Sequence, residues 1–219
     1  MGMNSVREFE TLWSHLGGGH AAEVGADLVR CYEERHRHYH TLTHIEECLG
    51  EAASVPLDEP SRARLCLAIW FHDAVYAIGC TDNEVQSAEL FRRSAPGLPA
   101  GLVEDVALLI LATQRHEVTP QNDSPLLRLF LDIDLAILGA PAERFERYDR
   151  EIRQEYASIP PLVLRPQAQE SPAAVSRSSA DLLYRALSRP LRGLRSSQSA
   201  PGARAVKRRS VVDRGRRRW

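Results

Sequence analysis

The 219-residue chain lacks the features that would place it in a membrane or outside the cell. No apolar run approaches the roughly 18 residues that a membrane-spanning helix needs. The first residues offer neither a basic start nor an apolar stretch, so a secretion signal is not predicted. With 43% hydrophobic and 26% charged residues, the composition is that of a globular protein and excludes a wholly disordered or collagen-like chain. We therefore expect a cytoplasmic protein with no membrane partner.

Cysteine is scarce, and no two cysteines form a Cys-x-x-Cys pair. A chain of this length can bury a core without disulfide bonds. We therefore expect reduced, mostly buried thiols and no zinc site built from cysteines. The four residues are Cys31, Cys48, Cys66 and Cys80.

Signals for β-structure are also missing. No stretch alternates between apolar and polar residues, and no Asn-Gly or Asp-Gly pair marks a hairpin. Apolar residues instead recur at helical spacing between glycine and proline breakers, which predicts an all-α domain over residues 1–158. The pair Thr81 and Glu84 has the spacing of a capping box at a helix start. The expected helices cover residues 5–16, 21–35, 60–76, 102–116, 125–138 and 141–156, with two more beginning after Thr43 and at Thr81.

The charge of the chain is divided between its two parts. Residues 1–158 carry 14 basic and 26 acidic side chains, a net charge of −12, whereas residues 159–219 carry 14 basic and 3 acidic ones, a net charge of +11. The second part is rich in Arg, Ser and Pro and is expected to be disordered or only partly helical. It would suit a nucleic-acid-binding arm, but without interleaved aromatic residues a charged extension with no specific partner is the favoured interpretation.

Imidazole and carboxylate groups recur on separate expected helices. The residues are His40, His44, the pair His72-Asp73, and Asp134. Divalent cations are bound by this mixture of nitrogen and oxygen ligands, and a helical bundle can bring such side chains together in its core. Each residue alone could be a hydrogen-bonded core histidine or a capping aspartate. A single cation, however, would neutralise all of them.

Helical periodicity indicates which of these side chains face inward. His72 shares a face with apolar residues of the expected helix 60–76, and Asp73 borders that face. Asp132 and Asp134 are about 200° apart on a helix, so they cannot both face one site. Asp134 lies on the apolar face, whereas Asp132 is expected to form a surface ion pair with Arg128.

The order His44, His72-Asp73, Asp134 resembles the H…HD…D signature of the HD-domain superfamily of metal-dependent phosphohydrolases. Residues 37–45 (RHYHTLTHI) are similar to the YHNxxH segment of that superfamily's cyclic-nucleotide phosphodiesterases. A bacterial group of predicted HD phosphohydrolases is more similar still, with RxYHxxxHI, WFHDxVY, NExxSA and DxDLAILG segments. The corresponding segments here are RHYHTLTHI, WFHDAVY, NEVQSA and DIDLAILG, and the resemblance covers roughly residues 5–158.

The resemblance implies a helical HD-type bundle in which four side chains hold a divalent metal ion. The ion could be Mn, Mg, Co, Ni, Fe or Zn, and the implied ligands are His44, His72, Asp73 and Asp134. It also implies that Asp73 is catalytic and that His40 donates a proton to the leaving oxygen.

Two further residues have open roles. His116 could support the ligands, bind a second ion or contact phosphate, or it could be an ordinary histidine at a helix end. Glu84 could position water, although a helix cap is a sufficient explanation.

The implied activity is hydrolysis of a phosphate mono- or diester, such as a nucleotide, by metal-activated water. The partner would then be a small phosphorylated substrate. The alternative is a degenerate HD fold that binds or regulates without turnover. The intact ligand set favours the enzyme. In the related group a further helical segment with a Tyr-x-x-Gly-Arg pattern follows, and the Arg-, Ser- and Pro-rich residues 159–219 in its place favour the alternative.

Overall fold

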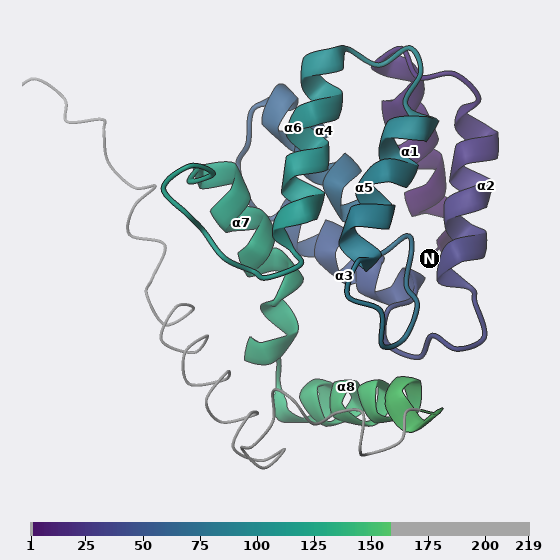
Figure 1. Cartoon of the computed structure of the whole chain (residues 1–219), viewed down its shortest axis with the longest axis vertical. Coiled ribbons are helices and arrows are strands. Elements are labelled where there is room, and N and C mark those ends of the chain that lie inside the picture. Colours follow the sequence, from purple (N-terminus) through teal and green to yellow (C-terminus); the bar gives the residue numbers. More distant parts are fainter. Residues whose placement is uncertain (1, 159–219) are drawn as a thin grey trace, which may run out of the picture. The chain divides into compact units, whose positions relative to one another are not determined.

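The computed structural model describes residues 2–158, and every regular element among them is helical (Figure 1). The predicted all-α class is therefore confirmed for this part of the chain. The predictions made for residues 159–219 lie outside the described residues. None of the helices found in residues 2–158 combines the length and apolar character needed to cross a membrane. The elements are α1 (Gly2–His15), α2 (Ala21–Tyr32), α3 (Leu42–Ala53), α4 (Glu59–Phe71), α5 (Asn83–Ser94), α6 (Ala100–Ala112), α7 (Pro125–Asp134), the 3-10 turn η1 (Ala136–Gly139), α8 (Ala142–Glu155) and the 3-10 turn η2 (Tyr156–Ser158).

Helix α4 is the centre of the bundle. It packs against α1, α3, α5, α6 and α7, and its second half is buried on every side, with Leu65, Leu67 and Ile69 all 0% exposed. Burying one such side chain contributes about 1.5–3 kcal/mol. Its aromatic end, Trp70-Phe71, packs beside Phe9 of α1, with ring centroids 5.3 and 6.2 Å from that ring. The whole core therefore holds the C-terminal end of α4 in a fixed position.

Helices α4 and α7, which lead into the candidate site, each begin with a side-chain N-cap. The Asp58 side chain accepts a hydrogen bond from the Ser61 amide at the start of α4 (2.7 Å). The Ser124 hydroxyl accepts one from the Leu127 amide at the start of α7 (3.1 Å). Each helix also has a proline in its first turn, where no amide donor is needed.

Helix α4 ends at Phe71, five residues before the predicted end, so the prediction of a continuous helix through Asp73 is wrong. The Arg37 guanidinium donates hydrogen bonds to the backbone carbonyls of Asp73 (2.6 Å) and Ala74 (3.0 Å). The His72 ring bonds to the carbonyl of Ile69 (2.9 Å). These bonds hold the segment after Phe71 as a turn.

Three other expected boundaries also change. The capping box at Thr81 is wrong, because α5 begins after Asp82 without a side-chain cap, and the Asn83 side chain bonds instead to the backbone of Ala77. Helix α6 ends at Ala112, so His116 lies beyond it in a left-handed conformation (φ 50°). Helix α7 ends at Asp134, where η1 begins after one residue.

Candidate metal centre

Four of the predicted site residues come from three helix ends. His44 lies in the first turn of α3, His72 and Asp73 follow the end of α4, and Asp134 is the last residue of α7. Consecutive residues within a helix point about 100° apart. His72 keeps helical backbone angles, and its ring contacts His44 and Asp134, while Asp73 contacts His72 and His44.

The donor atoms of these residues lie close together. The Nε2 atoms of His44 and His72 are 3.3 Å apart. Asp134 Oδ1 lies 3.2 Å from His44 Nε2 and 3.3 Å from His72 Nε2. Asp73 Oδ2 lies 3.0 Å from His72 Nε2 and 3.7 Å from His44 Nε2. Ligands bound about 2.1 Å from one ion are separated by about 3.0–3.4 Å. Four of these five distances fit a shared cation, and the distance between Asp73 and His44 is longer.

The hydrogen-bond pattern of His72 also fits a cation. Its Nδ1 faces the Ile69 carbonyl, which can only accept, so we assign the ring proton to Nδ1. The lone pair of a neutral His72 Nε2 then faces two carboxylate oxygens and another histidine nitrogen. Acceptors in such close contact need a positive charge between them, and a metal ion supplies it.

The charges of the cluster are strongly coupled. Burial disfavours the charged form of His72, but the carboxylates of Asp73 and Asp134 outweigh it and raise the pKa of His72 well above its usual value. Burial opposes ionisation of Asp134 as well, yet the adjacent His72, His116 and His44 hold its pKa well below the usual range. The cluster therefore attracts either protons or a cation, and a metal would have to displace the protons.

Cys48 is a fifth potential ligand that the sequence analysis missed. Its Sγ lies 3.8 Å from each ring nitrogen of His44, and with His44 and Asp134 it forms a second group of three potential ligands. The four-residue spacing between His44 and Cys48 could have identified this residue from the sequence, because it places Cys48 one turn after His44 on the same face of α3. Burial raises the pKa of this thiol well above its usual value. Buried His, Asp and Cys side chains thus form a cluster that could bind a metal ion.

The cysteine prediction is only partly confirmed. All four thiols are free, and Cys48 is buried. However, Cys31 and Cys66 are half-buried, and Cys80 is exposed.

His116 and Glu84 lie at the edge of this cluster. His116 Nε2 is 2.8 Å from Asp134 Oδ2, the oxygen that does not face His44 and His72. Glu84 is half-buried, lies in the first turn of α5 and lines a cleft beside the cluster.

His40 is held beside the cluster by Glu155, which the sequence analysis did not identify. The Nδ1 atom of His40 lies 2.8 Å from Glu155 Oε2. Glu155 Oε1 accepts hydrogen bonds from the backbone amides of His38, Tyr39 and His40 at 2.7, 2.8 and 2.9 Å. Glu155 is only 2% exposed, so it fixes the whole turn that precedes α3.

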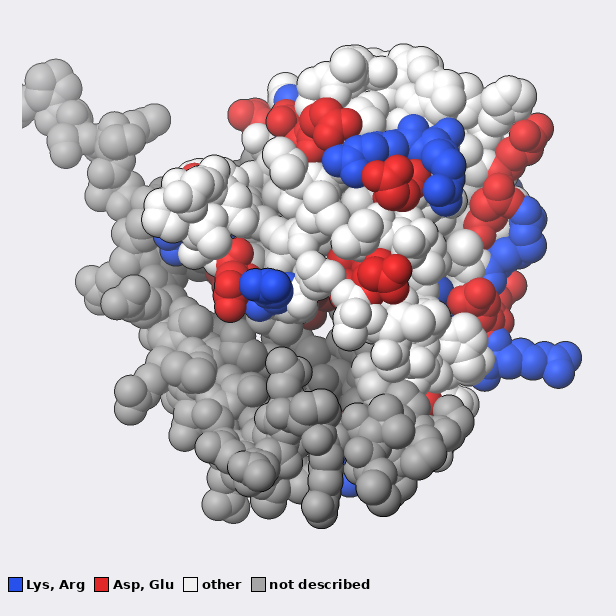
Figure 2. All heavy atoms as spheres, in the orientation of Figure 1, with Lys and Arg blue, Asp and Glu red and all other residues white. Residues whose placement is uncertain are grey.

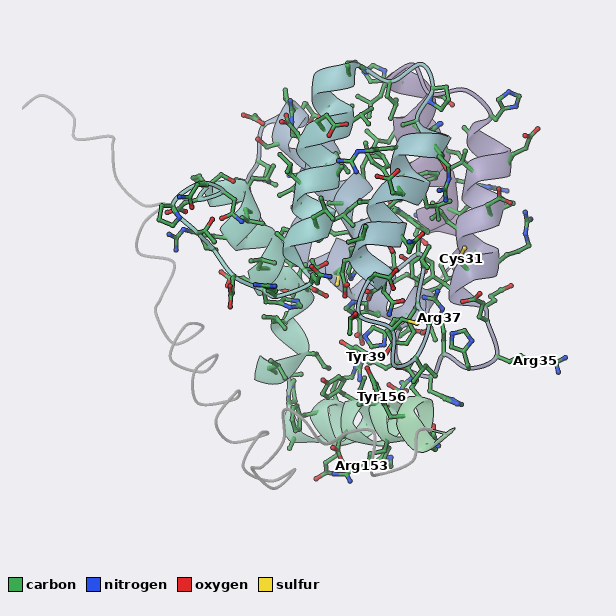
Figure 3. The ribbon with its side chains drawn as sticks, in the orientation of Figure 1. Cys31, Arg35, Arg37, Tyr39, Arg153 and Tyr156 are labelled. Atoms are coloured by element: carbon green, nitrogen blue, oxygen red, sulfur yellow. The ribbon has the colours of Figure 1, made fainter. Side chains whose placement is uncertain are left out.

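Helix α8 brings Glu155 into this position. It runs crosswise at the lower end of the bundle in Figure 1. Figure 3 shows Tyr39 and Tyr156 between α8 and the bundle, whereas Arg153 points away from the bundle. The Tyr76 hydroxyl also donates to Glu155 Oε2 (3.3 Å), which links the turn after α4 to the same carboxylate.

The surroundings favour a charged His40–Glu155 pair. Burial raises the pKa of Glu155, but the hydrogen bonds from the ring and backbone of His40 and the charge of that ring outweigh it and lower the pKa to about 2. Burial lowers the pKa of His40, but the charges of Asp73 and Glu155 outweigh it and raise the pKa above the usual value. His40 can therefore hold a proton near neutral pH.

One cleft of about 260 Å³ connects these groups. It is lined by His40, Asp73, His116 and Asp134, with tyrosine and aliphatic side chains around them. The Tyr39 hydroxyl is buried beside the cluster without a hydrogen-bond partner among the described residues. An orphaned buried hydroxyl of this kind is expected where a bound molecule or ion completes the site.

No family model, curated protein or solved structure matches the chain. Its function therefore has to be inferred from its own side chains.

The two aspartates of α7 offer a matched pair of variants. Asp134→Asn should lose most of its bound metal, because the carboxylate touches His44, His72 and His116. Asp132→Asn should keep its metal and change the free energy of unfolding by no more than about 0.5 kcal/mol. Asp132 is exposed, and its expected pairing with Arg128 is wrong, because the Arg128 guanidinium contacts Asp123 through two 2.7 Å bonds instead. Elemental analysis and urea unfolding of both variants test this difference. Loss of the metal from the Asp132 variant alone would contradict the assignment.

Glu155→Gln should show a characteristic pH dependence of stability. The pKa of Glu155 is about 2 in the folded chain, against 4.5 when unfolded, so ionised Glu155 stabilises the fold above pH 4.5. That contribution, about 2–3 kcal/mol, is lost as the pH falls from 4.5 towards 2. The difference in unfolding free energy between the original chain and Glu155→Gln, measured by urea unfolding, should therefore be nearly constant between pH 5 and pH 6, where His40 is also protonated, and shrink below pH 4.5. A difference that does not change between pH 6 and pH 3 would contradict the charged pair.

Proposed function

We propose that the chain is a metal-dependent phosphohydrolase that cleaves a phosphate mono- or diester. The convergence of His44, His72, Asp73 and Asp134 at the edge of a cleft, which Asp73 and Asp134 line together with His40, carries this proposal. The choice of phosphate esters is supported by the resemblance of four sequence segments to HD phosphohydrolases.

In this proposal His44, His72, Asp73 and Asp134 hold the divalent cation, and Cys48 lies beside His44 and Asp134. When bound, such an ion polarises phosphoryl oxygens and lowers the pKa of water. His116 holds the second oxygen of Asp134 and so orients that carboxylate. Asp73 also lines the cleft, where its carboxylate can accept a hydrogen bond from the attacking water and orient it.

His40 is proposed to protonate the leaving oxygen. Its Nδ1 is bonded to Glu155, so Nε2 is the ring nitrogen available to the cleft. The negative Glu155 stabilises the protonated ring, fixes its orientation, and prevents Nδ1 from acting as the donor. A proton given from Nε2 to the departing alkoxide would make that group a better leaving group.

The test is a substrate panel on the full chain. p-Nitrophenyl phosphate, bis(p-nitrophenyl) phosphate and nucleoside monophosphates would be assayed with each of Mn, Mg, Co, Ni, Fe and Zn. We expect hydrolysis of at least one ester that disappears with chelator and returns with metal. Tight metal binding without turnover of any ester would contradict the proposed enzyme and support the binding or regulatory alternative.

A further inference from the structure

We propose that the cleft selects small esters bearing a single phosphate on a planar or apolar alcohol and discriminates against polyphosphates. This inference rests on the proposed function and adds a substrate class to it. Three properties of the cleft lead to it: its charge, its wall and its size.

The cleft is acidic and has no free cationic side chain among the described residues. Asp73, Glu84 and Asp134 line it, while no Lys or Arg of residues 2–158 does so. His40 and His116 are the only basic side chains that the described part of the chain contributes to the lining. Sites that bind nucleoside di- and triphosphates surround the additional phosphates with Lys, Arg or amide-rich loops.

Two guanidinium groups lie next to the site: Arg37 is fully engaged, whereas Arg144 is engaged through two of its three nitrogens. Arg37 bonds to Glu34 through Nε (3.0 Å) and to the backbone carbonyl of Asp73 through Nη1 (2.6 Å), and its side chain is fully buried. Arg144 lines the adjoining cavity and pairs with Glu47 at 2.7 and 2.6 Å. Its third nitrogen, Nη1, is buried without a hydrogen-bond partner among the described residues and lies 3.7 Å from Glu151, outside the lining of the 260 Å³ cleft.

Paired cations are also common elsewhere on the described surface. Figure 2 shows many basic side chains lying against acidic ones, and Arg92, for example, contacts both Glu89 and Glu104.

A single phosphate could be neutralised by the proposed metal together with His40. A second or third phosphate would face Asp73, Asp134 or Glu84 without a compensating charge, which disfavours its binding.

The remaining wall of the cleft is apolar and aromatic. Leu135, Ile137 and Leu138 contribute from the end of α7 and from η1, and Tyr148 and Tyr156 contribute from α8 and η2. All five are half-buried, so a ligand can still cover them. Planar or apolar groups are bound by this kind of surface through burial and ring stacking.

The size of the cleft limits the ligand further. Its volume of about 260 Å³ lies just below the range of roughly 300–1,000 Å³ that is usual for sites enclosing drug-sized ligands. One phosphate and one small alcohol group suit such a space better than an oligonucleotide or a nucleoside triphosphate.

The experiment compares ligands that differ only in charge or in their alcohol. Binding of AMP and ATP to the full chain would be measured by calorimetry, with metal in excess over nucleotide, and hydrolysis would be followed in parallel. We expect ATP to bind at least about tenfold more weakly than AMP. Phenyl phosphate should bind more tightly than glycerol phosphate, because only its alcohol can pack on the apolar wall.

A matched pair of variants separates charge from shape. Leu138→Lys places an ammonium group in the cleft and should narrow the difference in affinity between AMP and ATP. Leu138→Gln introduces an uncharged side chain of similar length and should leave that difference in affinity unchanged. Equal binding of AMP and ATP by the original chain would overturn the inference, even if both were hydrolysed, and the proposed function would then stand. A large AMP preference without hydrolysis of any ester would instead overturn the proposed function and leave the charge selection in place.

Discussion

Replacing His72 by alanine is expected to remove the bound metal and to reduce ester hydrolysis to the background rate. The imidazole is 1% exposed and its Nε2 lies within 3.3 Å of His44, Asp73 and Asp134. Without it, the ion would lose one of its four proposed protein ligands, so affinity for a cation should fall steeply. Elemental analysis of the purified variant and a p-nitrophenyl phosphate assay measure the two losses.

Two controls separate loss of the ligand from loss of the fold. Asp73→Asn keeps the shape of the side chain and should also lose metal, while its helical circular dichroism signal should match that of the original chain. His15→Ala removes an exposed histidine of α1 and should leave the metal content unchanged. Stoichiometric metal in both His72→Ala and Asp73→Asn would show that the ion is held elsewhere.

His40→Ala should keep the metal but lower turnover by about 10²–10⁴-fold, the usual contribution of general acid catalysis. The loss should be largest for substrates with alkyl leaving groups, which depart poorly without a proton. It should be smallest for p-nitrophenyl esters, whose leaving group is already stable as an anion. Steady-state rates for the two substrate classes provide the measurement.

His38→Ala is the matched control for His40→Ala. His38 is exposed, and only its backbone amide contacts Glu155, so truncating its side chain preserves that contact. Its turnover should remain close to that of the original chain. Equal slowing of both substrate classes in a folded, metal-bound His40→Ala variant would contradict proton donation and leave His40 a packing role.

Local sequence patterns predicted the helices and the inward direction of Asp134. Periodic apolar residues gave α1, α2, α6 and α8 to within a few residues, because burial of one helix face decides such elements. Asp132 is exposed and Asp134 faces the interior, as helical phasing predicted, and there Asp134 contacts three histidines. These features depend on residues close together in the chain.

The missed features depend on contacts between distant residues. Helix α4 ends early because Arg37, 36 residues before Asp73, binds the carbonyls beyond it. Glu155 lies 115 residues after His40, on a helix where many charged side chains gave no sign that this one is buried. The supposed cap at Thr81 failed because Asn83 binds the backbone of Ala77 in a competing turn.

The central claim is that one cluster both binds the metal and supports hydrolysis. Its most direct test is a titration of the chelator-stripped full chain with Mn²⁺, in which bound metal and the rate of bis(p-nitrophenyl) phosphate hydrolysis are measured on the same samples. The structure at His44, His72, Asp73 and Asp134 leads us to expect that the rate rises in proportion to bound metal and levels off when the site is full. A rate that is already maximal in the stripped chain, or that stays at background when the site is full, would contradict the claim.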